Sequence, residues 1–278
     1  MRTFHQVRRR PAAPRGMTVV ELLVVIGLFG ALAALLFPAV QQARESARFR
    51  RCGNNLKNVA LALAEFHSYQ QTFPAGSDGL GQTEQAWSSR ILPHLELSNL
   101  AQAIDYDLAW NAPGANATAA GYNVPVYVCP SSQLRFAGKQ DYGGIIGTAL
   151  LPLPAGSGPR DAFGCGTLII TGPQQPLPVG AAQITDGLSF TMAGGESVDR
   201  ANGQAGLWAC GRNCFSQNEP SVVIDDVGSL FSFHPAGAQA WFGDGHVRVI
   251  GAGIYREVLG ALCTRNGAEA SANAAFTD

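Results

Sequence analysis

The sequence predicts an α+β protein in which one long N-terminal α-helix packs on a β-rich, mostly antiparallel head. A long apolar run near the N-terminus continues into a stretch with the periodicity of a helix. The chain holds 33 glycines and 16 prolines, which is typical of a turn-rich domain. An Asp-Gly pair between two apolar runs near the C-terminus predicts a β-hairpin.

The composition divides the chain into five segments. In order, they are a basic leader, a membrane-spanning half-helix, an amphipathic half-helix, a β-rich head and a flexible tail, over residues 1–16, 17–40, 41–70, 71–266 and 267–278. A stretch rich in proline and glycine at about 150–180 is expected to be an insertion in the head. After Gln70, acidic residues outnumber basic residues about two to one. Such a head is a poor binder of nucleic acid, so no nucleic-acid partner is expected.

The half-helix over residues 17–40 is long and apolar enough to cross a membrane. At about 1.5 Å per residue it would span roughly 36 Å, which exceeds a hydrocarbon core of about 30 Å. Glu21 is the one charged residue in this run. A carboxylate inside a membrane is costly, so its presence indicates a function. Pro38 removes a backbone hydrogen bond and is predicted to kink the helix where it leaves the membrane.

The residues around the start of the apolar run resemble the type IV prepilin signal, in which glycine precedes a hydrophobic residue, Thr-Leu/Val-x-Glu and an apolar helix. Gly16 is followed here by Met17, Thr18, two valines and Glu21. By this resemblance, a prepilin peptidase cleaves between Gly16 and Met17 and methylates the new amine. Glu21 would then pair, inside the membrane, with the amine of a neighbouring subunit.

The same resemblance implies a location and partners. The protein would be a single-pass protein of the inner membrane with an extracytoplasmic head, and it would form homo- or hetero-oligomers with other pilin-like subunits. Two alternatives compete. A secretory signal has an apolar core of about 7 to 15 residues with its cleavage site behind it, and the run here is longer. A plain signal anchor fits the length but leaves Glu21 unexplained.

Beyond Pro38, apolar side chains recur at alternating spacings of three and four residues. These side chains are Phe49, Cys52, Leu56, Val59, Leu63 and Phe66. The spacing predicts one face of a helix that ends near Tyr69 and lays this stripe against the head.

Within the head, residues 87–96 and 100–104 are predicted to form short helices around a proline. Strands are expected at residues 122–128, 167–171, 190–194, 205–209, 221–224, 230–233, 239–243 and 246–250. The last two flank Asp244-Gly245, a turn for which positive φ is expected at both central positions.

Several short motifs of the head resemble a bacterial family of prepilin-like proteins that carry domain of unknown function 1559. These motifs are Cys52-Gly-Asn-Asn, Phe73-Pro, Leu92-Pro, Cys129-Pro-Ser, Ile184-Thr-Asp-Gly, Gly195-Glu, and His234 with nine residues before Asp244-Gly245. The resemblance implies a pilin-like or pseudopilin-like architecture and brings no established activity. The chain departs from the family at Leu188-Ser-Phe, where members usually have Thr-Ser-Asn, and at Ser132, where an acidic residue is common.

No enzymatic motif is present. The chain lacks Gly-x-Ser-x-Gly, His-Glu-x-x-His, a phosphate-binding loop and a dinucleotide fingerprint. His234, Asp244 and His246 are the one candidate constellation, and structural roles are favoured for them, because turn chemistry accounts for Asp244. The sequence therefore predicts a structural protein without a catalytic residue, metal site or cofactor. The alternative is a membrane-tethered head that binds a ligand or acts as an enzyme and uses the prepilin signal only for export.

The six cysteines fit an exported head, because disulfides persist outside the cytoplasm. Cys210 with Cys214 and Cys52 with Cys129 are the candidate pairs, and free thiols are the alternative. A zinc site is disfavoured, because the chain lacks paired Cys-x2-Cys motifs.

Overall fold

The computed structural model describes residues 16–78, 81–151, 165–169, 171, 178–200, 205–220, 222 and 229–267. Nearly all of the predicted leader and tail, and much of the predicted insertion, lie outside these residues. The chain divides into two compact units, residues 1–46 and residues 47–278. The second is called the head unit below.

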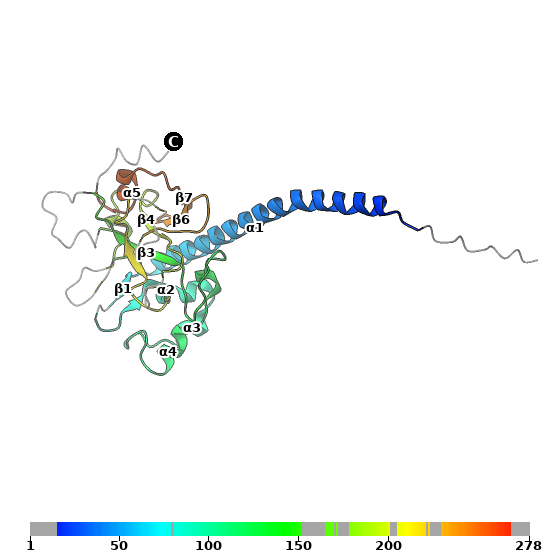
Figure 1. The fold of residues 1–278 in the computed structure, drawn as a ribbon. Coiled ribbons are helices and arrows are strands. Elements are labelled where there is room, and N and C mark those ends of the chain that lie inside the picture. The colour runs from blue at the N-terminus through cyan, green and yellow to red at the C-terminus, as the bar shows by residue number, and fades with distance from the viewer. Residues whose placement is uncertain are drawn as a thin grey trace, which may run out of the picture. The chain divides into compact units, whose positions relative to one another are not determined.

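Helix α1 (Val19–Gln70) begins in the first unit and runs without interruption through Pro38 and Gly53 (Figure 1). In the first unit its large apolar side chains are exposed, from Val19 to Val40. Among the described residues, α1 is the one helix long and apolar enough to cross a membrane. It is compatible with a single-pass membrane anchor, as the sequence predicts. The kink at Pro38 stays a prediction.

In the head unit, α1 buries one face, which confirms the predicted stripe at Cys52, Leu56, Val59 and Leu63, whereas Phe49 and Phe66 at its ends are half-buried. The buried residues of this helix are Cys52, Leu56, Val59, Ala60, Ala62 and Leu63. Gly53 lies where the side chain of Gln239 approaches the helix, because a Cβ added there would lie 2.6 Å from Gln239 Oε1. Gln239 Nε2 donates to the carbonyl of Phe49 (2.9 Å), and Lys57 Nζ donates to that of Gly245 (2.7 Å). Packing and these two hydrogen bonds hold this part of α1 against the segment that contains Gln239 and Gly245.

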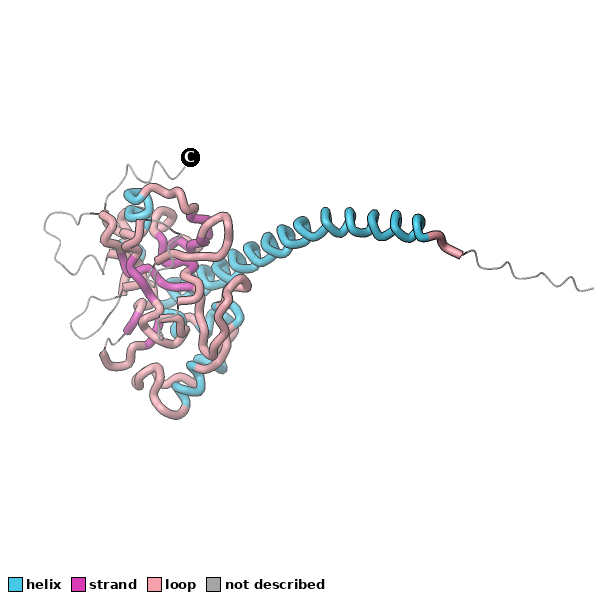
Figure 2. The backbone as a smooth tube through the Cα atoms, in the orientation of Figure 1, coloured by secondary structure: helices cyan, strands magenta, loops and turns pink. Residues whose placement is uncertain are grey.

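The head contains a five-stranded sheet in the order β5-β3-β4-β6-β7. The strands of the chain are drawn in magenta in Figure 2. Its strands are β3 (Tyr142–Gly147), β4 (Met192–Glu196), β5 (Cys214–Ser216), β6 (Ala238–Phe242) and β7 (Val247–Ile250). The β3–β5 pair is parallel and the other three pairs are antiparallel. A second sheet pairs β1 (Ser77–Asp78) with β2 (Gln85–Ala86). The α+β, pilin-like fold class predicted from the sequence is therefore confirmed.

Short helices occupy the connections. They are α2 (Trp87–Arg90), η1 (Leu92–Leu95), α3 (Ser98–Gln102), α4 (Ala115–Ala120), η2 (Pro125–Tyr127), η4 (Ala181–Gln183) and α5 (Arg256–Leu262). The predicted helices at 87–96 and 100–104 correspond to α2, η1 and α3. Helices α4 and α5 were not predicted.

Tryptophans fill the core of the head. Trp87, Trp208 and Trp241 are fully buried, and the ring centroids of Trp87 and Trp241 lie 5.4 Å apart. Glycines in the central strands make room for these rings. A Cβ on Gly194 would lie 2.1 Å from the Trp241 ring, and one on Gly144 would lie 3.2 Å from Trp87 Nε1. The side chains packed against strands β3 and β4 therefore explain why glycine occupies these two positions.

Several predicted strands are wrong. Residues 122–128 contain the 3₁₀-helix η2, because Pro125 starts a helical turn that buries Val124 and Tyr127, three residues apart. Residues 205–209 and 230–233 each make a single bridge, at Leu207 and Phe231. The described part of 167–171 forms no strand, and most of 221–224 lies outside the described residues. The strand expected at 190–194 exists as β4, two residues later.

The predicted hairpin is confirmed as β6 and β7, but its turn differs from the prediction. Gly245 has a φ of +86°, whereas Asp244 is not among the residues with positive φ. Four residues, 243–246, separate the strands. Backbone hydrogen bonds from Gly245 N to Phe242 O (2.9 Å) and from Phe242 N to His246 O (3.0 Å) close the loop. Within it, Asp244 Oδ1 accepts a hydrogen bond from the amide of His246 (3.1 Å).

Leu56→Ala should lower the free energy of unfolding of the head by about 2–5 kcal/mol, because the Leu56 side chain is fully buried and its removal leaves a cavity. Leu61→Ala is the matched control on the same helix, since Leu61 is 57% exposed; its effect should stay within about 0.5 kcal/mol. Urea denaturation of the detergent-solubilised full chain measures both. Equal effects of the two variants would contradict the packing described for α1.

Candidate functional site

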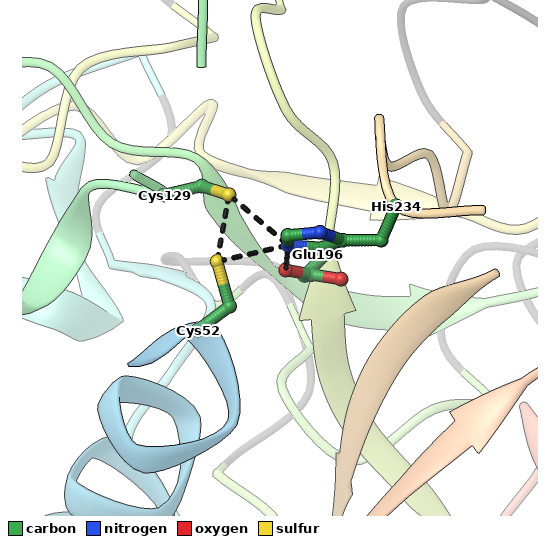
Figure 3. Close-up of side chains that lie close together, drawn as sticks. All are labelled: Cys52, Cys129, Glu196 and His234. Atoms are coloured by element: carbon green, nitrogen blue, oxygen red, sulfur yellow. Dashed lines mark hydrogen bonds and ion pairs between the residues drawn. The ribbon is translucent and has the colours of Figure 1, made fainter. Parts of the chain in front are cut away.

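Four buried side chains that ligate metals in proteins meet inside the head unit (Figure 3). Cys52 comes from α1, Cys129 from the segment after η2, Glu196 from the end of β4 and His234 from the segment before β6. Their ligand atoms all lie within 4.8 Å of one another. The three motifs Cys52-Gly-Asn-Asn, Cys129-Pro-Ser and Gly195-Glu, together with His234, are therefore brought to one point by the fold.

The imidazole of His234 lies beside both sulfur atoms and the carboxylate. His234 Nε2 lies 3.2 Å from Cys52 Sγ, 3.6 Å from Cys129 Sγ and 3.7 Å from Glu196 Oε1. The two sulfur atoms lie 2.7 Å apart. Since all four residues are at most 4% exposed, bulk water does not screen these groups from one another.

Neighbouring groups fix the two cysteines. The backbone amide of Cys129 donates to Asp141 Oδ2 (2.9 Å). Asn55, one turn after Cys52 on α1, donates to the carbonyl of Val128 (3.2 Å) and to the hydroxyl of Tyr142 (3.3 Å). The residue before Cys129 is thereby tied to the helix that carries Cys52.

The glutamate and the histidine are also held in place. The amide of Gln239 donates to Glu196 Oε2 (2.8 Å), so strand β6 orients the carboxylate at the end of β4. The ring of Phe49 meets the imidazole of His234 edge to face, with 5.2 Å between centroids. The other carboxylate oxygen, Glu196 Oε1, is buried and accepts no hydrogen bond from the described residues.

The pKa values of the cluster reflect its burial and the contact between the sulfurs. The hydrogen bond between the two cysteine side chains lowers the pKa of Cys129 to about 6, with burial opposing it and His234 adding to it. The same hydrogen bond raises the pKa of Cys52, and burial and the nearby Glu196 raise it further. Burial raises the pKa of Glu196 to about 7. The contact between the sulfurs therefore favours ionisation of Cys129 over ionisation of Cys52.

The sequence suggested His234, Asp244 and His246 as one candidate site, but the structure separates His234 from the other two residues. His234 belongs to the buried cluster, whereas Asp244 accepts hydrogen bonds from Ser189 Oγ (2.7 Å) and from the amide of His246. Asp244 and Gly245 thus shape the hairpin loop, as turn chemistry predicts. Asp225 and Asp226, upstream of His234, lie outside the described residues.

The cysteine pairs predicted from the sequence have different surroundings. Cys52 and Cys129 lie side by side, as the prediction that ties the helix to the head requires. Cys214 Sγ donates to the carbonyl of Gly211 (3.2 Å). None of these four cysteines forms a disulfide in the structure, and both disulfides stay predictions.

The sequence did not predict that Glu196 belongs to a site, nor that it lies together with Cys52, Cys129 and His234. The local spacing rules for zinc sites did not apply, because the four donors come from four distant segments. A usable signal was present, since three of the family-like motifs and His234 each contain one potential metal ligand. Taken together, rather than one by one, they indicate a shared site.

A second buried network supports the segment after Cys129. The ammonium group of Lys139 pairs with Asp141 and Asp199, and its side chain is 2% exposed. Asp199 also accepts hydrogen bonds from Ser132 Oγ (2.6 Å) and the amide of Gln133 (2.7 Å). Because Asp141 in turn accepts from the amide of Cys129, this network reaches the cluster.

Comparison with known protein families gives a match over residues 41–213 to the family described as a protein of unknown function (DUF1559). The matched range covers more than half of the chain and includes Cys52, Cys129 and Glu196. No curated protein and no solved structure matches the chain. The match confirms the family resemblance drawn from the motifs and assigns no activity.

Asp199→Asn should destabilise the head at about pH 7 by roughly 1 kcal/mol, a value limited by solvent screening of this partly buried group. Burial raises the pKa of Asp199, but hydrogen bonds from Ser132, Lys139 and Gln133 outweigh it and bring the pKa below its usual 3.8. A lowered folded-state pKa stabilises the fold above pH 3.8, and this contribution is lost as the pH falls through the folded-state value.

The difference in unfolding free energy between the wild type and Asp199→Asn should therefore shrink below pH 3.8. Asparagine tolerates the φ of +56° at this position, so the backbone is not disturbed. Urea titrations across pH measure the difference, with the exposed Asp107→Asn as control. A difference that does not change with pH would contradict the ionic role of Asp199.

Proposed function

Because this chain belongs to the family of proteins of unknown function DUF1559, and its apolar helix begins at Val19, three residues after Gly16, we propose that it is an exported, membrane-anchored, pilin-like structural subunit. In this proposal a prepilin peptidase cleaves between Gly16 and Met17 and methylates the new amine. The processed chain then assembles with itself or with other pilin-like subunits into a pilus-like or secretion-associated filament. The head is assigned no catalytic role.

The observation that carries the proposal is the placement of Glu21 on an exposed apolar helix. The large apolar side chains from Val19 to Val40 are exposed, and such a surface requires a membrane or neighbouring helices to cover it. Glu21 is the one charged residue from position 17 to 43. In an assembly of such helices, the methylated amine of a neighbouring Met17 is a cation that can pair with it.

Glu21 also has a role within its own chain. Its Oε2 accepts hydrogen bonds from the amide (2.8 Å) and the hydroxyl (2.9 Å) of Thr18, and the amide of Glu21 donates to Thr18 Oγ1 (3.3 Å). This is a capping box that begins helix α1. Capping and intermolecular pairing therefore need to be separated by experiment.

Glu21→Gln and Thr18→Ala separate these two roles. Glutamine still accepts the hydrogen bond that caps the helix but carries no charge. Glu21→Gln should leave cleavage intact and reduce the protein recovered in sheared surface filaments by at least about tenfold, because an unpaired amine in the membrane costs several kcal/mol. Thr18→Ala removes a cap worth about 0.5–2 kcal/mol, keeps the charge and should still assemble.

Mass spectrometry of the N-terminus, on membrane and sheared fractions, reads processing and assembly together. The proposal requires N-methylated Met17 in the sheared fraction of the wild type. An intact leader in both fractions would refute processing, and assembly of Glu21→Gln at the wild-type level would refute the charge pair. Processed chain found only in the membrane would favour the alternative, a tethered head that binds a ligand or acts as an enzyme.

A further inference from the structure

The buried cluster in the head unit has the composition of a metal site. We propose that Cys52, Cys129, Glu196 and His234 bind one Zn²⁺ ion, which links four distant segments of the head. This inference concerns the head unit alone and does not depend on processing or assembly.

The number and type of donors fit zinc. Structural zinc sites have four ligands in a tetrahedron, drawn from cysteine, histidine and carboxylates. Two sulfurs, one imidazole nitrogen and one carboxylate oxygen are present, and sulfur with nitrogen ligands in a tetrahedron favours zinc over magnesium or calcium. With all four positions filled by protein, the site has no open position and is structural.

The spacing of the donors requires little movement. In a tetrahedral zinc site, neighbouring ligand atoms lie about 3.3 to 3.8 Å apart. His234 Nε2 already lies 3.2 Å and 3.6 Å from the sulfurs and 3.7 Å from Glu196 Oε1. The two sulfurs, now 2.7 Å apart, would separate by about 1 Å.

A buried carboxylate oxygen without a hydrogen bond points to a cation. Glu196 Oε1 is fully buried and accepts no hydrogen bond from the described residues, and the imidazole of His234, 3.7 Å away, pairs with it only when protonated. Burying a carboxylate oxygen without a hydrogen bond is costly, and natural proteins avoid it. A zinc ion among the two sulfurs and the imidazole would coordinate this oxygen. Binding requires both cysteines as thiolates, so their protons are released to solvent and no electron is transferred.

The surroundings of the donors resemble the outer shell of a metal site. The amide of Gln239 holds Glu196 Oε2, which leaves Oε1 directed at the cluster. Asp141 fixes the backbone at Cys129, and Asn55 joins the segment before it to α1. Groups that orient the ligands in this way before the ion binds raise metal affinity.

A disulfide between Cys52 and Cys129 is the competing state. It would consume both sulfur ligands and leave the buried carboxylate of Glu196 without a metal cation. The zinc site accounts for all four donors, whereas the disulfide accounts for two. The two states exclude each other and are chemically distinguishable.

The first experiment measures zinc in the full-length chain, extracted from membranes in detergent without chelators and supplied with Zn²⁺. Elemental analysis should find about one zinc per chain. Glu196→Gln and His234→Gln should each lower zinc affinity by at least about tenfold in competition with a chromophoric chelator. Glu65→Gln and His94→Gln are the matched controls, because this Glu–His pair lies elsewhere in the head, on α1 and η1; they should bind zinc as the wild type does.

The second experiment uses the wild type alone and does not depend on how a variant folds. The chain is denatured in an alkylating reagent without reductant, and the cysteine peptides are identified by mass spectrometry. The proposal predicts that Cys52 and Cys129 are each alkylated. A Cys52–Cys129 disulfide in zinc-free protein would overturn it, as would wild-type protein that binds no zinc. Wild-type zinc affinity in both Glu196→Gln and His234→Gln would overturn it as well.

Discussion

The head depends on the burial of one face of helix α1. Leu56, Val59 and Leu63 are at most 2% exposed and form part of the same core as Trp87 and Trp241. Burying side chains of this kind contributes about 1.5–3 kcal/mol each. The helix is therefore part of the core, and the register of its stripe determines what can lie next to it. Gly53 and Lys57 illustrate this, because each faces a particular group of the β6–β7 hairpin.

The buried cluster follows from that register. Cys52 is the first buried residue of α1, where the segment after η2, the end of β4 and the segment before β6 converge on the helix. A shift of α1 by one turn, about 5.4 Å, would remove the sulfur of Cys52 from His234. Packing of the stripe thus places the sulfur of Cys52. The segments around β4, β6 and η2 place the donors of Glu196, His234 and Cys129. A metal ion there would in turn hold these segments together, which couples the site to the stability of the head.

The features predicted from the sequence are those encoded by neighbouring residues. The spacing of Cys52, Leu56 and Val59 defines a helical face, and Asp244-Gly245 between apolar runs defines a hairpin. Strand β3 was missed because glycine is rare in strands, and the side chains of Leu168 and Trp87, both distant in sequence, explain Gly144. The proposed strand over Val124 and Tyr127 was wrong because proline and a three-residue spacing produced a 3₁₀ turn. The cluster was missed for the same reason as β3, since its members meet only in the folded chain.

The most direct test of this account is amide hydrogen exchange on the full-length chain in detergent, followed by mass spectrometry. Residues 52–63 of α1 should exchange as slowly as strand β6, because both open only when the head unfolds. Exchange in residues 52–63 about 100-fold faster than in β6 would contradict it, because the helix would then leave the sheet while the head stays folded.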